Sequence, residues 1–307
     1  MKRFTCALVA ATALAPAAQA ALPSSLAVVG DARANGWTVA TDPAVQSLSA
    51  RLAALGRKVR VRSSTKDDAL AADLLLQLPP ILAARPDLVV IQTGENDFCA
   101  GNDTPVAAFR LQIVRALTVL SHALPNARLF VVSIPFSSQR LQALVGDPTA
   151  EAGWSTGGEC DPHWDADGNP DPQQLALIDR LVQRYDAALQ ATCALFLHCR
   201  YDRGTATTLA AAPDDDTSLA AAEWSALGEF ADTTPPVSTA NVHSSRGTRT
   251  VTLTARDETG LAGIEYVLGA NKVWRRYRGP LHLPPHTSLT WRAVDTSGNV
   301  ETAQTLH

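Results

Sequence analysis

The chain has 307 residues, of which 46% are apolar and 18% charged, and its formal net charge is −4. The length favours two domains over one, and the apolar content is sufficient for a buried core, which excludes wholesale disorder. The mild acidity and the lack of any Lys/Arg run argue against a nucleic-acid-binding protein.

The first twenty residues have the pattern of a secretory signal peptide. Lys2 and Arg3 precede an apolar stretch over residues 4–15, and Ala18-Gln19-Ala20 forms a cleavage signal. This apolar stretch is too short for a membrane-spanning helix, and no later stretch reaches ~20 residues. We therefore predict export to the periplasm or the extracellular space, with an uncleaved N-terminal anchor as the alternative. No transmembrane segment is expected in the mature chain.

The cysteines remaining after cleavage predict disulfides. Removal of residues 1–20 removes Cys6 and leaves Cys99, Cys160, Cys193 and Cys199. An even number of cysteines in an exported chain is typical of disulfide bonding. Three pairings are possible, and we favour a local Cys193–Cys199 bond together with a Cys99–Cys160 bond between loops. A zinc site is the competing interpretation, but the sequence has no Cys-x-x-Cys pair or Cys/His group with ligand spacing.

Residues 21–231 alternate between short apolar runs and helical patterns. Apolar runs typical of buried parallel strands occur at residues 26–29, 59–61, 88–91, 129–132 and 195–197. Helical patterns lie between them over residues 44–55, after Thr104-Pro105 and after Asp171-Pro172, where a capping residue precedes proline. This alternation predicts a parallel sheet with helices on both faces, and in such folds the site lies at the carboxyl ends of the strands.

The pattern changes near residue 232. Asp232-Thr233-Thr234-Pro235-Pro236 is typical of a stiff linker. Beyond it, apolar residues alternate with threonines over residues 250–255, and further short strands are predicted at residues 264–268, 273–277 and 289–293. Residues 232–307 are therefore predicted to form a small β-sandwich.

Two turns follow predicted strands: Gly30-Asp31-Ala32 after the first strand and Gly94-Glu95-Asn96-Asp97 after a later one. These turns and their surroundings resemble the SGNH (GDSL) esterase/lipase family, in its secreted bacterial lipase-like branch. The resemblance covers residues 26–231 and implies a three-layer, flavodoxin-like α/β fold. The tail, with Asp295-Thr296-Ser297-Gly298-Asn299, resembles the bacterial Ig-like modules that are often appended to secreted enzymes.

The resemblance assigns catalytic positions, but this chain lacks the two central groups. In the family, a serine after Gly-Asp attacks the ester and a histidine from a late Asp-x-x-His removes its proton, because a hydroxyl alone is a poor nucleophile. The nucleophile position here is Ala32, and the histidine position is Ser218, with Asp215 at the orienting carboxylate. No histidine occurs between His198 and His243. Losing either group costs about 10⁶-fold in turnover in well-studied triads.

The family's oxyanion-hole positions match in part. Gly94 and Asn96 correspond to the third block, whose asparagine amide receives the developing oxyanion, whereas the second block, near residues 63–66, contains no glycine. Gly94 and Asn96 can either line a ligand pocket or stabilise the turn at the end of the strand. We favour a turn-forming role for Asp31 and a helix-capping role for the acidic run over residues 214–216.

Other polar groups have simpler interpretations. Asp165, Asp167, Asn169 and Asp171 resemble the start of a calcium loop, but positions six and twelve are Pro170 and Ala176. We expect Asp171 to cap a helix, His163 to lie in a surface loop, and Trp274 and Trp291 to be core or half-buried strand residues. An exposed tryptophan pair would instead suggest glycan contact.

The leading hypothesis is an exported protein of the SGNH fold that has lost serine hydrolysis and binds an ester, lipid or glycan. The alternative is an active carboxylic-ester hydrolase with a rearranged site, using Ser63, Ser64 or Ser218 as nucleophile and His163 as base. A deliberately inactivated variant is a third interpretation, although the missing second-block glycine favours natural drift. No cofactor is expected, and the sequence does not indicate an oligomeric state.

Overall fold

The computed structural model describes residues 23–56, 58–99, 104–143, 145–148, 160–209, 216–227, 234–245, 247–258, 260–271, 273–295 and 297–307. The predicted signal peptide, Asp215 and the start of the predicted linker lie outside these ranges. Among the helices described, none is long and apolar enough to cross a membrane.

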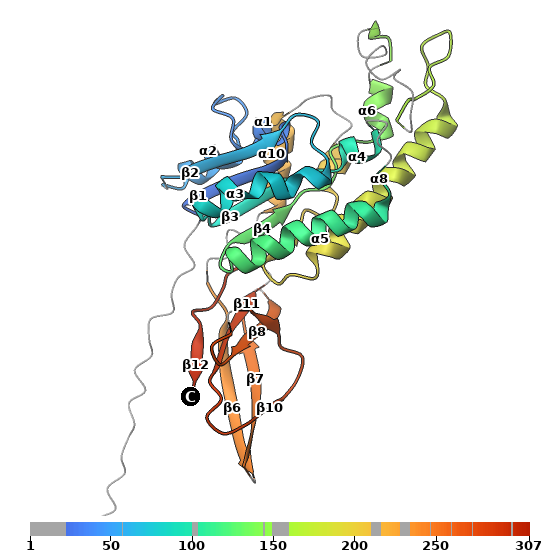
Figure 1. Ribbon diagram of the computed structural model, residues 1–307. Helices are drawn as coiled ribbons and strands as arrows, with labels where there is room; N and C mark the ends of the chain where they lie inside the picture. Colours follow the sequence, from blue (N-terminus) through green and yellow to red (C-terminus); the bar gives the residue numbers. More distant parts are fainter. Residues whose placement is uncertain are drawn as a thin grey trace, which may run out of the picture.

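A five-stranded parallel sheet organises the larger part of the molecule (Figure 1). Its strands are β1 (Ser25–Asp31), β2 (Arg60–Lys66), β3 (Leu88–Gln92), β4 (Arg128–Val131) and β5 (Cys199–Tyr201). They lie in the order β2-β1-β3-β4-β5, which is the order of flavodoxin-like folds. The chain therefore has the α/β fold with a parallel sheet that the family resemblance implies.

Helices cover both faces of this sheet. They are α1 (Ala34–Thr38), α2 (Leu48–Ala54), α3 (Leu74–Ala84), α4 (Glu95–Cys99), α5 (Val106–Ala123), α6 (Ser138–Ala143), α8 (Pro172–Cys193), α9 (Thr205–Leu209) and α10 (Asp216–Ala226), with a 3₁₀ turn, η1 (Ala71–Asp73). One buried cluster joins α3, α5 and α8 to one face, and a second joins α1, α2, α9 and α10 to the other. Alternate strand residues enter opposite clusters, as in Leu129 and Phe130, so the sheet is the middle of three layers.

One predicted strand is not formed, and one predicted helix starts later than expected. The apolar run at residues 195–197 is not a strand: it lies in the turn that follows α8, and Leu195 is 57% exposed. The backbone N–H groups of Leu195 and Phe196 donate to Thr192 and Cys193 at the end of that helix, and β5 begins only at Cys199. The helix predicted over residues 44–55 is shorter, because Ser47 caps it and starts α2 at Leu48.

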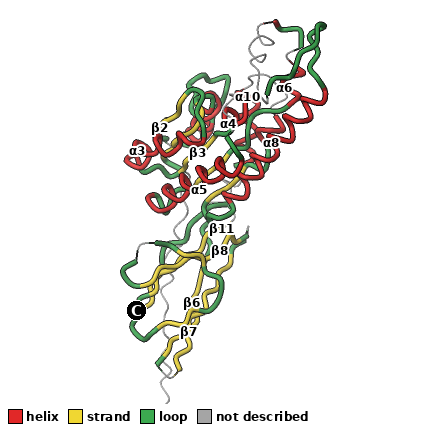
Figure 2. Tube along the Cα trace, turned by 45° about the vertical axis from the view of Figure 1, so that its right-hand side comes forward, coloured by secondary structure: helices red, strands yellow, loops and turns green. Residues whose placement is uncertain are grey.

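The C-terminal residues form two antiparallel sheets, which are compatible with the small β-sandwich expected from the sequence (Figure 2). One sheet has the order β10 (Leu281–Leu283), β7 (Thr248–Arg256), β6 (Val237–Ser245), and the other β12 (Gln304–Leu306), β11 (Leu289–Asp295), β8 (Leu261–Leu268), β9 (Arg275–Arg276). A single buried cluster lies between them, and it includes Trp291, whose indole N–H donates to the Ser238 hydroxyl at 3.0 Å. Trp274 is half-buried, with the Arg292 guanidinium 4.1 Å from its ring centroid. The two tryptophans are therefore not an exposed pair.

Arg292 also joins the sandwich to the parallel-sheet domain. It lies on β11, is 4% exposed, and pairs with Glu265 of β8. Its guanidinium donates to the Asn126 side-chain oxygen at 2.5 Å and to the Pro125 carbonyl at 2.6 Å, both in the loop before β4. Arg128 donates in the opposite direction, to Asn299 at 2.8 Å. The two parts of the chain are thus held together by charged hydrogen bonds.

Candidate functional site

The candidate site lies where β1 and β3 end side by side. In a sheet of this order the connections diverge between these two strands, which leaves a crevice at their carboxyl ends. Gly30 is needed for their close approach, because it has a φ of +107° and a Cβ there would lie 1.8 Å from the Gln92 carbonyl oxygen. The chain thus presents Asp31 and Ala32 at the mouth of the crevice.

The nucleophile position is occupied by a methyl group whose backbone N–H is already bonded. Ala32 follows β1 directly, and its N–H donates to the Lys66 carbonyl at 3.1 Å, extending the β1–β2 pairing by one residue. In serine hydrolases of this family the corresponding N–H is an oxyanion donor, as the resemblance implies. Here the Ala32 N–H instead forms part of the hydrogen bonding between β1 and β2.

Asn96 is also fully engaged. Its side-chain amide donates to the Asp31 carboxylate at 2.7 Å and to the Ala69 carbonyl at 3.3 Å. A primary amide has two hydrogens, so these two bonds use both of them. The other Asp31 oxygen accepts the Arg33 N–H at 2.9 Å, which is the turn-forming role expected for Asp31. Gly94 lies beside Ile134 with a φ of +123°, a backbone conformation that favours glycine.

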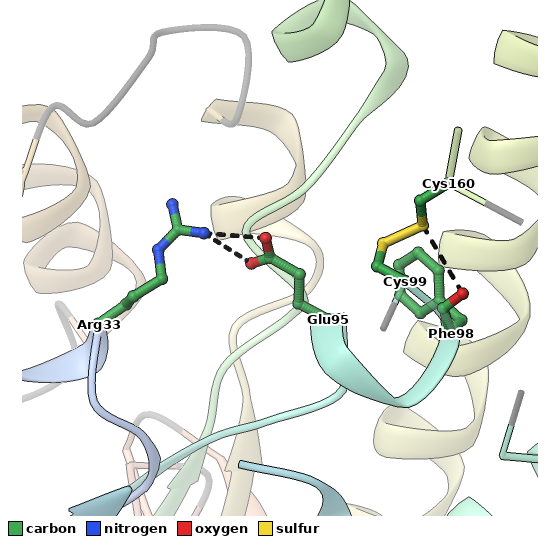
Figure 3. Close-up of a disulfide and its surroundings, with 5 residues drawn as sticks. All are labelled: Arg33, Glu95, Phe98, Cys99 and Cys160. Carbon is green, nitrogen blue, oxygen red and sulfur yellow. Dashed lines mark hydrogen bonds and ion pairs between the residues drawn. A yellow bond between two sulfur atoms is a disulfide. The ribbon is translucent and has the colours of Figure 1, made fainter. Parts of the chain in front are cut away.

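An ion pair that could not be foreseen closes one side of the crevice. The Arg33 guanidinium donates to the two carboxylate oxygens of Glu95 at 2.8 and 3.1 Å (Figure 3). Burial raises the pKa of Glu95, and the positive charge of Arg33 opposes this rise. Figure 3 shows Glu95 at the start of α4 and Cys99 at its end, where the disulfide to Cys160 anchors the helix.

The crevice itself is small and acidic. A cavity of about 270 Å³ is lined by Asp31, Arg33, Asp67, Asp68, Glu95 and Asn96. Four of these six side chains are carboxylic acids, one is a cation and one is an amide. Every lining residue on the described part of the chain is therefore polar, so the cavity offers hydrogen-bonding groups rather than an apolar wall.

The loop after β2 contributes to the cavity. Residues 63–66, where the second block was expected, form the end of β2, and the next two residues, Asp67 and Asp68, line the cavity. Asp68 has a φ of 52°, in the left-handed region where glycine is usual. The loop thus keeps a glycine-like conformation without a glycine.

The histidine position lies at the same end of the molecule. Ser218 is in the first turn of α10, which packs against α1, the helix that follows Ala32. The two helices approach closely, since a Cβ on Gly36 would be 2.1 Å from an Asp216 carboxylate oxygen. Asp216 belongs to the first turn of α10, where a negative charge is favourable. The orienting position, Asp215, is outside the described residues.

The groups of the rearranged-site alternative lie on different parts of the fold. Ser63 and Ser64 are on the edge strand β2, and the Ser63 hydroxyl donates to Asn35 at 2.8 Å. His163 is exposed, in the loop that runs from Cys160 to α8. Figure 1 shows β2 and the start of α8 on opposite sides of the domain. The structure therefore does not bring these serines together with His163.

The candidate calcium ligands have structural partners. One oxygen of Asp165 accepts the backbone N–H groups of Asp167 and Asn169, both at 2.9 Å, and the Asn169 hydrogen bond lowers the pKa of Asp165. Asp171 caps α8 by accepting the Gln173 N–H at 2.8 Å. Across the residues that the structure describes, no group of three or more His, Cys, Asp or Glu side chains is arranged to hold a metal ion.

Both favoured disulfides are confirmed. Cys99 is bonded to Cys160 over a separation of 61 residues, and Cys193 to Cys199 over a separation of 6. The first joins α4, at the crevice, to the loop before α8. The second closes the turn between α8 and β5.

Several buried carboxylic acids near the carboxyl ends of the strands were not predicted. Burial raises the pKa of Asp97 and of Asp186 to about 6 each. Asp186 accepts the Ile134 N–H at 2.9 Å and the Thr207 hydroxyl at 2.6 Å. Glu223 is fully buried, and burial together with the neighbouring Asp202 raises its pKa well above the usual range. Their spacing in the sequence gives no signal, because each is brought inside by a different element.

Solved structures with similar backbones were found at low identity. An acetyl xylan esterase, AlAXEase, has 13% identity and a TM-score of 0.44, with 66% of this chain and 98% of that chain covered. A putative GDSL-like lipase from Parabacteroides merdae has 14% identity and a TM-score of 0.44, with coverages of 66% and 95%. An extracellular lipase from Streptomyces rimosus has 16% identity and a TM-score of 0.38, with coverages of 59% and 81%.

No curated protein matches the chain significantly. The decisive comparison is with a family sequence profile, which matches residues 28–223 and so includes the second half of β1, the crevice and most of α10. The chain belongs to the GDSL-like lipase/acylhydrolase family.

Proposed function

We propose that this protein is an exported member of the family that does not hydrolyse esters and instead binds a hydroxyl-rich glycan in the crevice between β1 and β3. The observation that carries the proposal is Ala32, since a methyl group cannot attack a carbonyl carbon. Ser218 at the histidine position supports it, because the base is missing as well.

The hydrogen bonding around Ala32 supports the same conclusion. An oxyanion hole requires N–H groups that point at the position of the developing charge. The Ala32 N–H and both amide hydrogens of Asn96 already have acceptors within the protein. A tetrahedral intermediate would therefore find two of the expected donors occupied.

The cavity lining favours a glycan over an ester or a lipid. Carboxylates accept hydrogen bonds from sugar hydroxyls, whereas an acyl chain needs apolar walls. Asp31, Asp67, Asp68 and Glu95 surround the cavity with Arg33 as the opposing cation, so a fatty-acid anion would also be repelled. A neutral polyhydroxylated ligand fits this lining best.

The proposal also includes export of the protein and the identity of its C-terminal part. Residues 1–20 act as the export signal, and the two disulfides are typical of an oxidising compartment. Residues 232–307 form an Ig-like module that accompanies the family domain, supported by its two antiparallel sheets and shared core.

The test measures hydrolysis and binding in the same preparation of the full mature chain. We expect no hydrolysis of p-nitrophenyl acetate or butyrate, no labelling by a fluorophosphonate probe, and binding of at least one of cellotetraose, xylotetraose and chitotetraose by calorimetry. Asp68→Asn should weaken that binding, whereas Asp257→Asn, on the sandwich, should leave it unchanged. Stoichiometric labelling together with ester turnover would overturn the loss of catalysis. Failure of all three oligosaccharides to bind would overturn the glycan assignment.

A further inference from the structure

A second cavity lies between the parallel-sheet domain and the sandwich, and we call it the junction cavity. It has a volume of about 240 Å³ and lies along the starts of β3, β4 and β5, where Leu88, Arg128 and Cys199 contribute to its lining. Ala262, Asp295 and Gly298 of the sandwich complete it. The crevice of the proposed glycan site lies at the carboxyl ends of β1 and β3 and shares no lining residue with the junction cavity, so the two cavities are independent.

The junction cavity carries an excess of positive charge. Arg128, Arg200 and Arg203 line it, and Asp295 is the carboxylate that opposes them among the described lining residues. Burial lowers the pKa of Arg200 to about 10, with Asp295 raising it and Arg203 and Arg128 lowering it further. Arg200 therefore stays protonated at neutral pH, and the three guanidinium groups lie close enough to repel one another. An anion between them would relieve this repulsion.

His198 adds a buried polar group that lacks a partner. The residue is 6% exposed, and neither of its ring nitrogens has a hydrogen-bond partner among the described residues. It lines both the junction cavity and a neighbouring cavity that includes Trp274 and Arg292. Burial and the positive charge of Arg292 lower its pKa to about 4, so the imidazole is neutral at pH 7. Buried polar groups are nearly always bonded, and an unpartnered one beside a cavity indicates that a ligand or water completes it.

Apart from Ser297, the rest of the lining is apolar or glycine. Leu88, Phe130, Leu197 and Leu227 contribute to the walls of the junction cavity. A cluster of cations beside apolar side chains matches a ligand with a charged head and an apolar body. Since drug-sized ligands usually occupy roughly 300–1,000 Å³, this cavity suits a smaller molecule.

We propose that the junction cavity binds a small organic anion, a carboxylate or phosphate monoester with an apolar body. Its head lies against Arg200 and Arg203, and its body lies on Leu88 and Phe130. Because residues of both parts of the chain line the cavity, bound ligand stabilises the junction as well.

Calorimetric titration of the full mature chain at low salt tests the proposal with benzoate, phenyl phosphate, inorganic phosphate and benzyl alcohol. We expect benzoate or phenyl phosphate to bind, and the tighter of the two identifies the head group. Arg200→Gln and Arg203→Gln should each weaken binding at least about tenfold, because each removes a charge-assisted hydrogen bond. Arg203 is exposed, so its variant should fold even if the Arg200 variant does not.

Arg62→Gln is the matched control, because Arg62 is an exposed residue of the edge strand β2, remote from the lining. It should leave the affinity unchanged. Unchanged affinity in both Arg200→Gln and Arg203→Gln would overturn the site. If benzyl alcohol bound as tightly as benzoate, the requirement for a negative charge would be overturned. If inorganic phosphate bound as tightly as phenyl phosphate, the requirement for an apolar body would be overturned. The same variants should bind oligosaccharides as the wild type does, because the substitutions lie outside the crevice. Measuring this binding therefore distinguishes a failure of the junction cavity from a failure of the proposed glycan site.

Discussion

The side-chain amide of Asn96 donates a hydrogen bond of 2.7 Å to the carboxylate of Asp31, across 65 positions of the sequence. This bond joins the end of β1 to the first turn of α4, and the same amide also reaches the Ala69 carbonyl in the loop after β2. Three segments that would surround a substrate in a catalytic relative are thereby held to one another.

Replacing Asn96 should therefore destabilise the fold. Asn96→Ala leaves a partly buried carboxylate oxygen and a carbonyl without their donor, at an expected cost of about 1–3 kcal/mol in the free energy of unfolding. Urea denaturation of the variant measures this cost. Asn241→Ala, at an exposed position of β6, should change stability by less than about 0.5 kcal/mol. An equally small effect at Asn96 would mean that the three segments do not depend on its amide.

Introducing a serine at position 32 and a histidine at position 218 should produce nucleophilic reactivity. In Ala32→Ser combined with Ser218→His, we expect the imidazole on α10 to activate the hydroxyl at position 32, because α10 packs against α1, the helix that follows this position. We expect fluorophosphonate labelling of the double variant and of neither single variant. Ester turnover should remain low, because the donors at positions 32 and 96 are engaged. Labelling of Ala32→Ser alone would show that another residue serves as the base.

The two disulfides should differ in their contribution to stability. In the chain-entropy account, a bond that closes a longer loop restricts the unfolded chain more. Cys99→Ala/Cys160→Ala should therefore cost about 4 kcal/mol and Cys193→Ala/Cys199→Ala about 2 kcal/mol. Urea denaturation of the two double variants checks which loss is larger. If the unfolding free energy depends on urea concentration with the same slope in both, the variant with the lower midpoint is the less stable. The reverse order would show that local packing in the turn after α8 outweighs loop closure.

Asp186 should make the protein less stable as the pH rises. Its pKa is raised from 3.8 to about 6 by burial, so the stability that it contributes is present below about pH 4 and is lost as the pH rises through 6. We subtract the unfolding free energy of Asp186→Asn from that of the wild type. This difference should be about 2 kcal/mol larger at pH 4.5 than at pH 7.5. Urea denaturation at both pH values tests this. A difference that does not vary with pH would exclude a raised pKa.

The Arg292–Glu265 pair should show strong coupling. Arg292→Gln leaves Glu265, which is 6% exposed, without its cation, and we expect a loss of about 3–5 kcal/mol. Arg292→Gln combined with Glu265→Gln should recover part of this loss, because it removes the unpaired buried charge. Thermal unfolding of the single and double variants gives the coupling energy. Additive effects would contradict a buried, mutually dependent pair.

The parts of the fold that the sequence predicts are those in which local pattern and burial coincide. β3 is a continuous apolar run because both of its faces are buried, and the cap at Asp171 followed by Pro172 marks the start of α8. The run at residues 195–197 is equally apolar, yet it forms a turn, since hydrophobicity alone does not distinguish a strand from a packed turn. α3 could not be predicted in this way, because it contains Pro79 and Pro80.

Some features of the candidate site can likewise be predicted from the sequence, and others cannot. The absence of a serine at position 32 and of a histidine near position 218 can be read directly from the residues. The pairing of Arg33 with Glu95 cannot, because it depends on how β1 and β3 lie together. The same is true of the acidic lining and of the junction cavity, which combine segments that are distant in the chain.

The bond from the Ala32 N–H to the Lys66 carbonyl has a consequence for turnover at this crevice. Under the proposed loss of hydrolysis, a hydroxyl at position 32 is not sufficient for turnover, because the N–H of the same residue is part of the β1–β2 pairing. Freeing this N–H for an oxyanion would break a hydrogen bond of the sheet and so weaken the fold. A gain of turnover at this crevice would therefore be coupled to a loss of stability.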